Sequence, residues 1–283
     1  MTTIGICGAG TMGAGIACAA LQAGYSVFLY DSAEAARSRG ITFIRQTFAK
    51  AIEKEKMSQS SADVAMKHLT SCSSLKELKT CDLVIEAIVE DKAVKHAVFT
   101  ELEALLRPDA ILATNTSSIA ITTLAQGLKR PQRFIGMHFF NPAHVMKLVE
   151  VIPGMQTAPE VVQAVVEVAR KMGKTPVVAR DVPGFIVNRV ARNFYLEAMR
   201  IVMEGGAAFP DVDAIMRSQG FKMGPFELMD VIGLDVNFAV TLSVWEQYFR
   251  EPRFAPAQMQ REYVEAGLLG KKTGEGFYQY STK

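Results

Sequence analysis

Apolar residues in the first part of the chain gather in short runs, and most of these runs are followed by a stretch with helical spacing. The helical patterns between them include residues 92–106 and 160–172. Short apolar runs that alternate with helices are typical of a mostly parallel sheet covered on both faces. The runs that predict strands are TIGICGAG, YSVFLYD, CDLVIEAI, AILATNTS, RFIGMHFF and KTPVVA.

The pattern changes at DVPGFIVNR, where Pro183 and Gly184 interrupt it. Residues 185–204 contain no helix breaker, and this length predicts one helix of about 30 Å. Further helical patterns cover residues 211–218, 225–249 and 256–266. We therefore expect an α/β domain over residues 1–183, followed by an all-α domain over residues 184–283.

Three glycines after the first apolar run have the spacing G-x-G-x-x-G between a predicted strand and a predicted helix. In this arrangement the first glycine permits a tight turn, the second lets the backbone approach a pyrophosphate, and the third lets the helix pack closely on the sheet. The first domain is thus predicted to be a Rossmann-type dinucleotide-binding domain. The loop assigned to the coenzyme consists of Gly8, Ala9, Gly10, Thr11, Met12 and Gly13.

Asp31 ends the second predicted strand, 18 residues after Gly13. A carboxylate at this position binds the ribose 2′-hydroxyl of NAD and repels the 2′-phosphate of NADP. NAD is therefore the expected coenzyme. Arg37 and Arg39 follow closely enough to leave NADP open.

The composition favours an ordinary globular protein and excludes few other classes. The 283 residues are 49% hydrophobic and 21% charged, and the net charge of +2 gives no reason to expect a nucleic-acid partner. Four cysteines without metal-ligand spacing predict free thiols, no metal site and a reducing compartment. With no signal peptide and no apolar run of about 20 residues, we expect a cytoplasmic protein without a membrane span.

The apolar residues of the second domain are numerous, which favours a homodimer that buries part of this domain against a second copy.

His138 and Glu150 lie in two neighbouring apolar runs. Their spacing alone leaves two interpretations open. They are either a packed histidine and a surface glutamate or an acid/base pair.

The chain resembles the L-3-hydroxyacyl-CoA dehydrogenases, particularly the short bacterial 3-hydroxybutyryl-CoA dehydrogenases, over nearly its whole length. The motifs that carry the resemblance are GAGTMGAGIA, DLVIEAIVED, ATNTSSI, GMHFFNPAHVMKLVEVI, DVPGFIVNR, MGPFELMDVIGLD and GKKTGEGFYQY. Several of these motifs are long, and they occur in the order found in the family.

The resemblance implies a role for particular residues. It implies that His138 is the catalytic base, Glu150 its orienting partner, Ser117 a hydroxyl at the substrate oxygen and Asn188 a substrate-side amide. Lys50 and Lys54 are candidates for the phosphates of CoA, although a solvated helix face explains them equally well. The residues implied for the coenzyme, besides the glycine loop, are Asp31, Glu90, Lys95, Ser117, Asn141 and Lys272.

The implied reaction is the reversible oxidation of a 3-hydroxyacyl-CoA by NAD to a 3-oxoacyl-CoA. Histidine suits the proton transfer because its ordinary pKa of about 6.5 allows it to take and return a proton near neutrality. A carboxylate on the other ring nitrogen would fix the tautomer. Two strands joined by NPAHVM could bring positions 138 and 150 together, and Asn188 would place the site between the two domains.

Rival interpretations remain at this point. The 6-phosphogluconate-type β-hydroxyacid dehydrogenases share the glycine loop but use a lysine on the long interdomain helix, and GFIVNRVARNFYLEAMR contains none. A non-catalytic structural protein that retains the cofactor fold is a second alternative. The length of the acyl chain cannot be derived from these motifs, so 3-hydroxybutyryl-CoA and 3-hydroxyadipyl-CoA both fit as substrates.

Overall fold

The computed structural model describes residues 1–280. The chain divides into two compact units, Met1–Asp181 and Val182–Lys283. The first is an α/β unit and the second is helical, as the sequence pattern predicts. Each unit is described by itself below.

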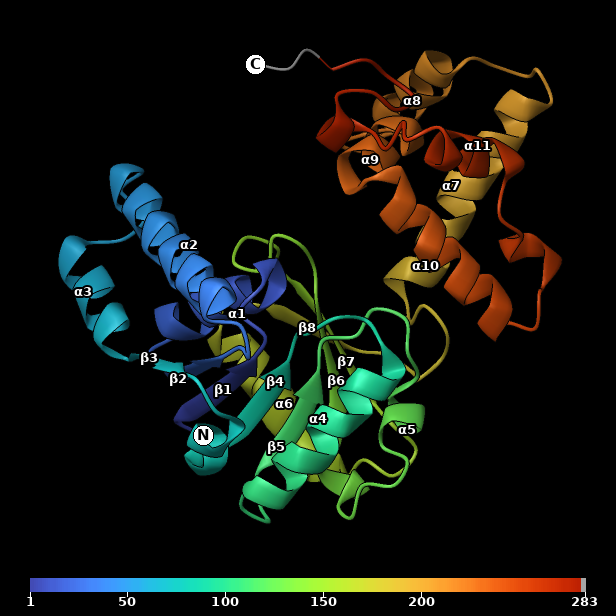
Figure 1. Cartoon of the computed structure of the whole chain (residues 1–283). Coiled ribbons are helices and arrows are strands. Elements are labelled where there is room, and N and C mark those ends of the chain that lie inside the picture. Colours follow the sequence, from blue (N-terminus) through green and yellow to red (C-terminus); the bar gives the residue numbers. More distant parts are fainter. Residues whose placement is uncertain (281–283) are drawn as a thin grey trace. The chain divides into compact units, whose positions relative to one another are not determined.

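The first unit is built on one eight-stranded sheet with the order β3-β2-β1-β4-β5-β6-β7-β8 (Figure 1). All neighbouring strands are parallel except β6 and β7, which are antiparallel, so the predicted mostly parallel sheet is confirmed. The strands are β1 (Thr3–Cys7), β2 (Ser26–Tyr30), β3 (Leu69–Cys72), β4 (Leu83–Glu86), β5 (Ile111–Thr114), β6 (Phe134–Phe139), β7 (Leu148–Pro153) and β8 (Thr175–Val178).

Helices cover both faces of this sheet; in Figure 1, α4 lies in front of the strands and α6 behind them. Buried side chains of α1, α2, α3 and α6 form one continuous apolar core with the strands. The helices are α1 (Thr11–Gln22), α2 (Glu34–Glu53), α3 (Gln59–Lys67), α4 (Lys92–Leu105), α5 (Ile121–Leu124) and α6 (Pro159–Lys171), with short 3₁₀ turns at η1 (Leu75–Thr80) and η2 (Pro131–Arg133).

The edge strand β3 is absent from the sequence prediction. Only one of its four residues, Cys72, is buried, so its sequence LTSC lacks the apolar run that marks the other strands. It forms because β2 offers it a parallel partner. Pairing of this kind depends on tertiary context and leaves little trace in the local sequence.

The helical unit contains α7 (Val187–Met203), α8 (Phe209–Ser218), α9 (Pro225–Ile232), α10 (Leu234–Gln247), α11 (Gln258–Glu265), η3 (Pro252–Phe254) and η4 (Lys271–Thr273). The single helix predicted over residues 225–249 is wrong. Gly233 has a φ of +99°, which ends α9 and turns the chain by 101° into α10. The glycine in the sequence VIGLD was the available signal for this break.

The last described segment packs back onto the helical unit. The ring of Phe277 is buried against Phe209, Phe226 and Tyr263, with centroids 4.7 to 5.0 Å away. The carboxylate of Asp230 accepts hydrogen bonds from the backbone N–H groups of residues 277 and 278 at 3.0 and 2.9 Å. Burial raises the pKa of this carboxyl, and the same hydrogen bonds oppose that rise.

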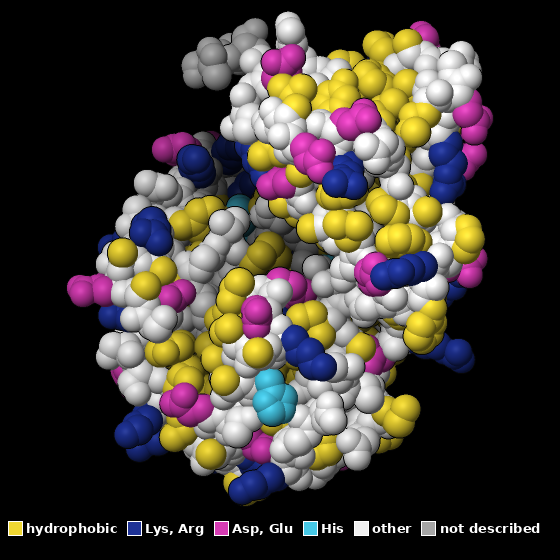
Figure 2. All heavy atoms as spheres, turned by 45° about the vertical axis from the view of Figure 1, so that its right-hand side comes forward, with side chains coloured by type: hydrophobic (Ala, Val, Ile, Leu, Met, Phe, Trp, Pro, Cys, Tyr) yellow, Lys and Arg dark blue, Asp and Glu magenta, His cyan; other side chains and the backbone are white. Residues whose placement is uncertain are grey.

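Apolar side chains are also exposed on the helical unit, and they are numerous on the face that Figure 2 shows. Val190 on α7 and Ile215 on α8 are 67% and 60% exposed. Within residues 1–280, no single helix is long and apolar enough to cross a membrane, and the bent pair α9–α10 passes that test of length and composition only when the two are taken together.

Candidate active site

The glycine loop joins β1 to α1 in the geometry that a dinucleotide requires. A Cβ added to Gly13 would lie 1.8 Å from the carbonyl oxygen of Gly8, so the first turn of α1 can lie against the loop only with glycine there. A Cβ on Gly10 would meet nothing within 4 Å, which leaves the backbone at the start of α1 open to a ligand. Such a helix start presents backbone N–H groups to an anion.

Asp31 follows β2 and borders the same loop. One oxygen of its carboxylate accepts the N–H of Ala9 at 2.9 Å, and the other accepts the N–H of Ala33 at 3.0 Å. Arg37 lies beside it and donates to the backbone carbonyl of Asp31 at 2.6 Å. A crevice lined by Gly8, Gly10, Asp31, Ala87 and Val89, among others, opens over the carboxyl ends of β1, β2 and β4.

His138 and Glu150 lie directly opposite each other on the antiparallel strands β6 and β7. Nδ1 of His138 is 2.8 Å from Oε2 of Glu150, and both side chains are buried. A carboxylate can only accept, so this contact places the proton of neutral imidazole on Nδ1 and leaves Nε2 as the acceptor. The pair thus has the geometry of a base with an orienting partner.

The loop after β5 carries Ser117 and approaches the same strand end. Oδ1 of Asn115 accepts the N–H of Phe139 at 2.8 Å, next to His138 in the chain. Glu90 accepts the backbone N–H of Ser117 at 3.0 Å. The structure therefore brings the Ser117 loop and the end of the His138 strand together.

Glu90 and Lys95 belong to a buried charge cluster. The ammonium of Lys95 lies 2.5 Å from Glu86 and 3.2 Å from Glu90, and this lysine is 1% exposed. Burial would raise the pKa of Glu90, but the charge of Lys95 and hydrogen bonds from Thr116 and Ser117 outweigh it and hold the pKa below its ordinary value. Glu90 therefore stays ionised at neutral pH.

Comparison with known proteins agrees with this geometry. The family model described as 3-hydroxyacyl-CoA dehydrogenase, NAD binding domain, matches residues 3–182, and the model of the C-terminal domain of the same family matches residues 184–280. The chain belongs to the 3-hydroxyacyl-CoA dehydrogenase family. Its first domain is an NAD-binding domain.

Three members of this family illustrate the similarity. The chain is 46% identical to the 3-hydroxyadipyl-CoA dehydrogenase of Escherichia coli over 98% of its own length and 59% of that protein, so it spans somewhat over half of this relative. It is 40% identical to the 3-hydroxybutyryl-CoA dehydrogenase of Bradyrhizobium diazoefficiens, over 98% and 94% of the two chains. The crystal structure of (S)-3-hydroxybutyryl-CoA dehydrogenase from Ralstonia eutropha superposes with a TM-score of 0.96 at 39% identity and full coverage of both chains.

The remaining residues that the family resemblance implies are divided between the two units. Asn141 is exposed just after β6, at the start of the β6–β7 connection. Lys50 and Lys54 are exposed at the end of α2, and their assignment to CoA stays a prediction. Asn188 and Lys272 belong to the helical unit, where Lys272 forms an ion pair with Asp235 at 2.5 Å.

Sequence reasoning missed several residues that hold the site. Lys174 is 8% exposed and donates to the carbonyls of Ala143 and Met146 at 2.6 and 2.9 Å, which fixes the connection between the strands of His138 and Glu150. Glu86 was also missed, although a charged residue inside the apolar run DLVIEAI was a signal that could have found it.

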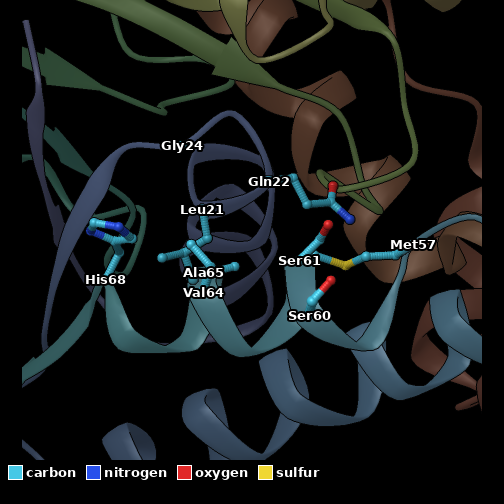
Figure 3. A pocket seen from close by; sticks show the side chains of 9 residues that line it. All are labelled: Leu21, Gln22, Gly24, Met57, Ser60, Ser61, Val64, Ala65 and His68. Atoms are coloured by element: carbon cyan, nitrogen blue, oxygen red, sulfur yellow. The ribbon is translucent and has the colours of Figure 1, made fainter.

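A second hollow in the first unit lies away from this site (Figure 3). Figure 3 shows Met57 and Ser61 near Gln22, with His68 at the other end of the hollow. Its residues come from the end of α1, from α3 and the segment before it, and from Gly24 and His68, which precede β2 and β3 at the amino ends of these strands. The coenzyme loop follows the carboxyl end of β1, so this hollow lies at the opposite edge of the sheet.

Among the described residues, no group of His, Cys, Asp or Glu side chains could hold a metal ion.

Asp31 should select NAD over NADP. We expect Asp31→Asn to lower the ratio of kcat/KM for NADH to that for NADPH by roughly 10- to 100-fold, because a hydrogen bond from a ribose hydroxyl to a carboxylate is lost and a repulsive charge is removed. Arg37 donates to the backbone carbonyl of residue 31 and not to its carboxylate, so it would stay beside the site to attract a 2′-phosphate. Steady-state kinetics with both coenzymes at fixed ionic strength measure this ratio, and a ratio near one in the unmodified protein would contradict the assignment.

Proposed function

We propose that the chain catalyses the reversible, NAD-dependent oxidation of L-3-hydroxyacyl-CoA to 3-oxoacyl-CoA, with short acyl chains as the preferred substrates. The observation that carries the proposal is the buried contact of 2.8 Å between His138 and Glu150, next to the loop of Ser117 and in the same unit as the glycine loop. The similar proteins named 3-hydroxybutyryl-CoA dehydrogenase support a short acyl chain in the substrate.

The groups present can move the proton that the reaction releases. The overall reaction is 3-hydroxyacyl-CoA plus NAD⁺ to 3-oxoacyl-CoA plus NADH and H⁺, and the bound nicotinamide supplies the hydride acceptor. Nε2 of His138 takes the proton of the substrate hydroxyl as the C3–H bond breaks. Glu150 stabilises the imidazolium that forms, and the Ser117 hydroxyl binds the substrate oxygen. Asn188 is proposed to contact the substrate from the helical unit.

The direct test uses the purified chain with NAD and a series of L-3-hydroxyacyl-CoA substrates from four to sixteen carbons, including 3-hydroxyadipyl-CoA. We expect NADH to form, with the highest kcat/KM at four carbons. The absence of turnover with every member would leave the non-catalytic structural protein as the better interpretation.

A dicarboxylic substrate is the second candidate. The relative from Escherichia coli named 3-hydroxyadipyl-CoA dehydrogenase is 46% identical to this chain, a higher identity than that to the relative from Bradyrhizobium diazoefficiens. A kcat/KM that is higher for 3-hydroxyadipyl-CoA than for the four-carbon substrate would favour this candidate.

We also propose that the chain forms a homodimer through its helical unit. The support is the exposed apolar surface of α7 to α10, because surfaces of this kind are usually covered by a partner. The exposed side chains are Val190, Ile201, Met203, Ile215, Phe221, Val231, Ile232 and Val236. Sedimentation at micromolar concentration should show a species of about twice 30.9 kDa. A single boundary at the mass of the monomer would contradict it.

A further inference from the structure

Glu86 is a fully buried carboxylate at the end of the central strand β4. One of its oxygens accepts the N–H of Ile88 at 2.7 Å and a bond from Lys95 at 2.5 Å, and the other accepts the hydroxyl of Thr114 at 2.6 Å. Burying a carboxylate is costly unless it is paired and hydrogen-bonded, and a well-packed apolar residue would often serve stability as well or better. The function of the site is therefore the better reason for an acid at this position.

Lys95 joins Glu86 to the exposed side of the cluster. The side chain of Lys95 is 1% exposed, and its ammonium bridges the carboxylates of Glu86 and Glu90. The buried ammonium of Lys95 therefore fixes the separation of the two carboxylates. With two carboxylates and one ammonium, the cluster carries one formal negative charge.

The carboxylates of Glu86 and Glu90 hold the loop of residues 114–118 at two points. Glu86 binds the hydroxyl of Thr114, the last residue of β5, and its own carbonyl accepts the N–H of Asn115 at 2.8 Å. Glu90 binds the hydroxyl of Thr116 at 2.5 Å and the N–H of Ser117 at 3.0 Å. The start and the turn of the loop are thus both attached to a pair of acids that Lys95 keeps in place.

We propose that Glu86 is a positioning residue for the reaction: through Thr114, and through Lys95 and Glu90, it fixes the loop of residues 114–118 and the Ser117 hydroxyl. The importance of that hydroxyl rests on the proposed function. In this arrangement Lys95 acts on the loop through its ion pair with Glu90. The part played by Glu86 is electrostatic, because its negative charge balances Lys95 and leaves Glu90 available to Ser117.

Glu86→Gln tests this with little change in volume. The amide can still accept the N–H of Ile88, but Lys95 loses one of its two carboxylates and is expected to draw Glu90 away from Ser117. Because a displacement of about 1 Å in a catalytic group costs up to about 100-fold, kcat should fall by roughly 10- to 100-fold.

A double-variant cycle separates positioning from a general loss of stability. If Glu86 acts by placing the Ser117 hydroxyl, Glu86→Gln should cost less than about threefold in kcat when Ser117 is already alanine. A loss of kcat in the double variant that equals the product of the losses in Glu86→Gln and Ser117→Ala would overturn the proposal. Glu103→Gln is the matched control, because this acid on α4 is also buried. Its carboxylate accepts the backbone N–H groups of Lys129 and Arg130 and lies 3.9 Å from the guanidinium of Arg130. Glu103→Gln should lower the melting temperature without lowering kcat.

Hydrogen exchange of the Ser117 amide supplies a measurement that does not depend on turnover. In Glu86→Gln this amide should exchange at least about tenfold faster than in the unmodified protein, because its acceptor is displaced. An unchanged rate would overturn the proposal even if the unmodified protein is active. If the chain shows no dehydrogenase activity, faster exchange still supports the positioning of the loop, while the role of Ser117 in catalysis falls with the proposed function.

Should Glu86→Gln fail to fold, Thr114→Val keeps the shape of the side chain but removes the hydrogen bond to Glu86 and the weaker one that the hydroxyl accepts from the N–H of Thr116 at 3.3 Å. We expect the same changes at a smaller size, roughly three- to tenfold in kcat, as for the loss of one strong hydrogen bond. A kcat equal to that of the unmodified protein, with unchanged exchange at Ser117, would overturn the proposal.

Discussion

Replacement of His138 by glutamine is expected to lower kcat by roughly 10²- to 10⁴-fold, which is the usual contribution of a positioned general base. Glutamine has a similar reach and can hydrogen-bond to Glu150, but it cannot take the proton of the substrate hydroxyl. The dissociation constant for NADH should hardly change, because the glycine loop and Asp31 are untouched. Turnover with the four-carbon substrate and fluorescence titration with NADH measure the two quantities.

His68→Gln is the control for this prediction. His68 is exposed at the opposite edge of the sheet, where its ring lies 3.3 Å from the hydroxyl of Ser26. Its replacement should leave kcat unchanged. If His138→Gln retained a kcat within about threefold of the unmodified protein, another group would have to be the base.

Replacement of Gly13 by alanine has the second largest expected effect, on both stability and coenzyme binding. The new methyl group would lie 1.8 Å from the carbonyl oxygen of Gly8, so α1 or the loop must shift. Overpacking of this kind costs about 1 to 3 kcal/mol, which corresponds to a loss of several degrees in melting temperature. Because the shift displaces the N–H groups that hold the pyrophosphate, affinity for NADH should fall by about tenfold or more.

Gly10→Ala provides the contrast to Gly13→Ala. Its methyl group would meet no protein atom within 4 Å, and its φ of −70° suits alanine. The melting temperature should therefore stay the same, whereas affinity for NADH should fall because the methyl group projects into the space of the coenzyme. An unchanged melting temperature in Gly13→Ala, or unchanged affinity in Gly10→Ala, would contradict the described loop geometry or the place of the coenzyme.

Local features of the sequence were enough to predict the glycine loop. The requirement at Gly13 comes from a neighbour only five residues away, and Asp31 follows directly from the end of the second strand. The likeness to a known family then indicated that His138 and Glu150 form an acid/base pair, an interpretation that the spacing alone left open. The pairing of these two residues depends on the register of an antiparallel hairpin, which a spacing of twelve residues does not determine.

The buried charges could not be predicted in this way. The ammonium of Lys95 lies between Glu86 and Glu90, and this position depends on where β4, α4 and the loop before α4 meet, while the assignment of Lys95 to the coenzyme stays a prediction. Similarly, the ion pair between Lys272 and Asp235 joins residues 37 positions apart. Charge partners that are distant in the chain have no spacing rule, so only the fold reveals which charges balance each other.

The most direct test of the central claim, that His138 and Glu150 act as one unit in the transfer of the proton, is the kcat of the double variant His138→Gln/Glu150→Gln. Glu150→Gln alone should lower kcat, because an amide can either donate or accept at Nδ1 and cannot stabilise the imidazolium. Once His138 is gone, the carboxylate has no proton transfer to assist. The account predicts that the double variant loses about as much kcat as His138→Gln alone. A loss equal to the product of the two single losses would contradict it.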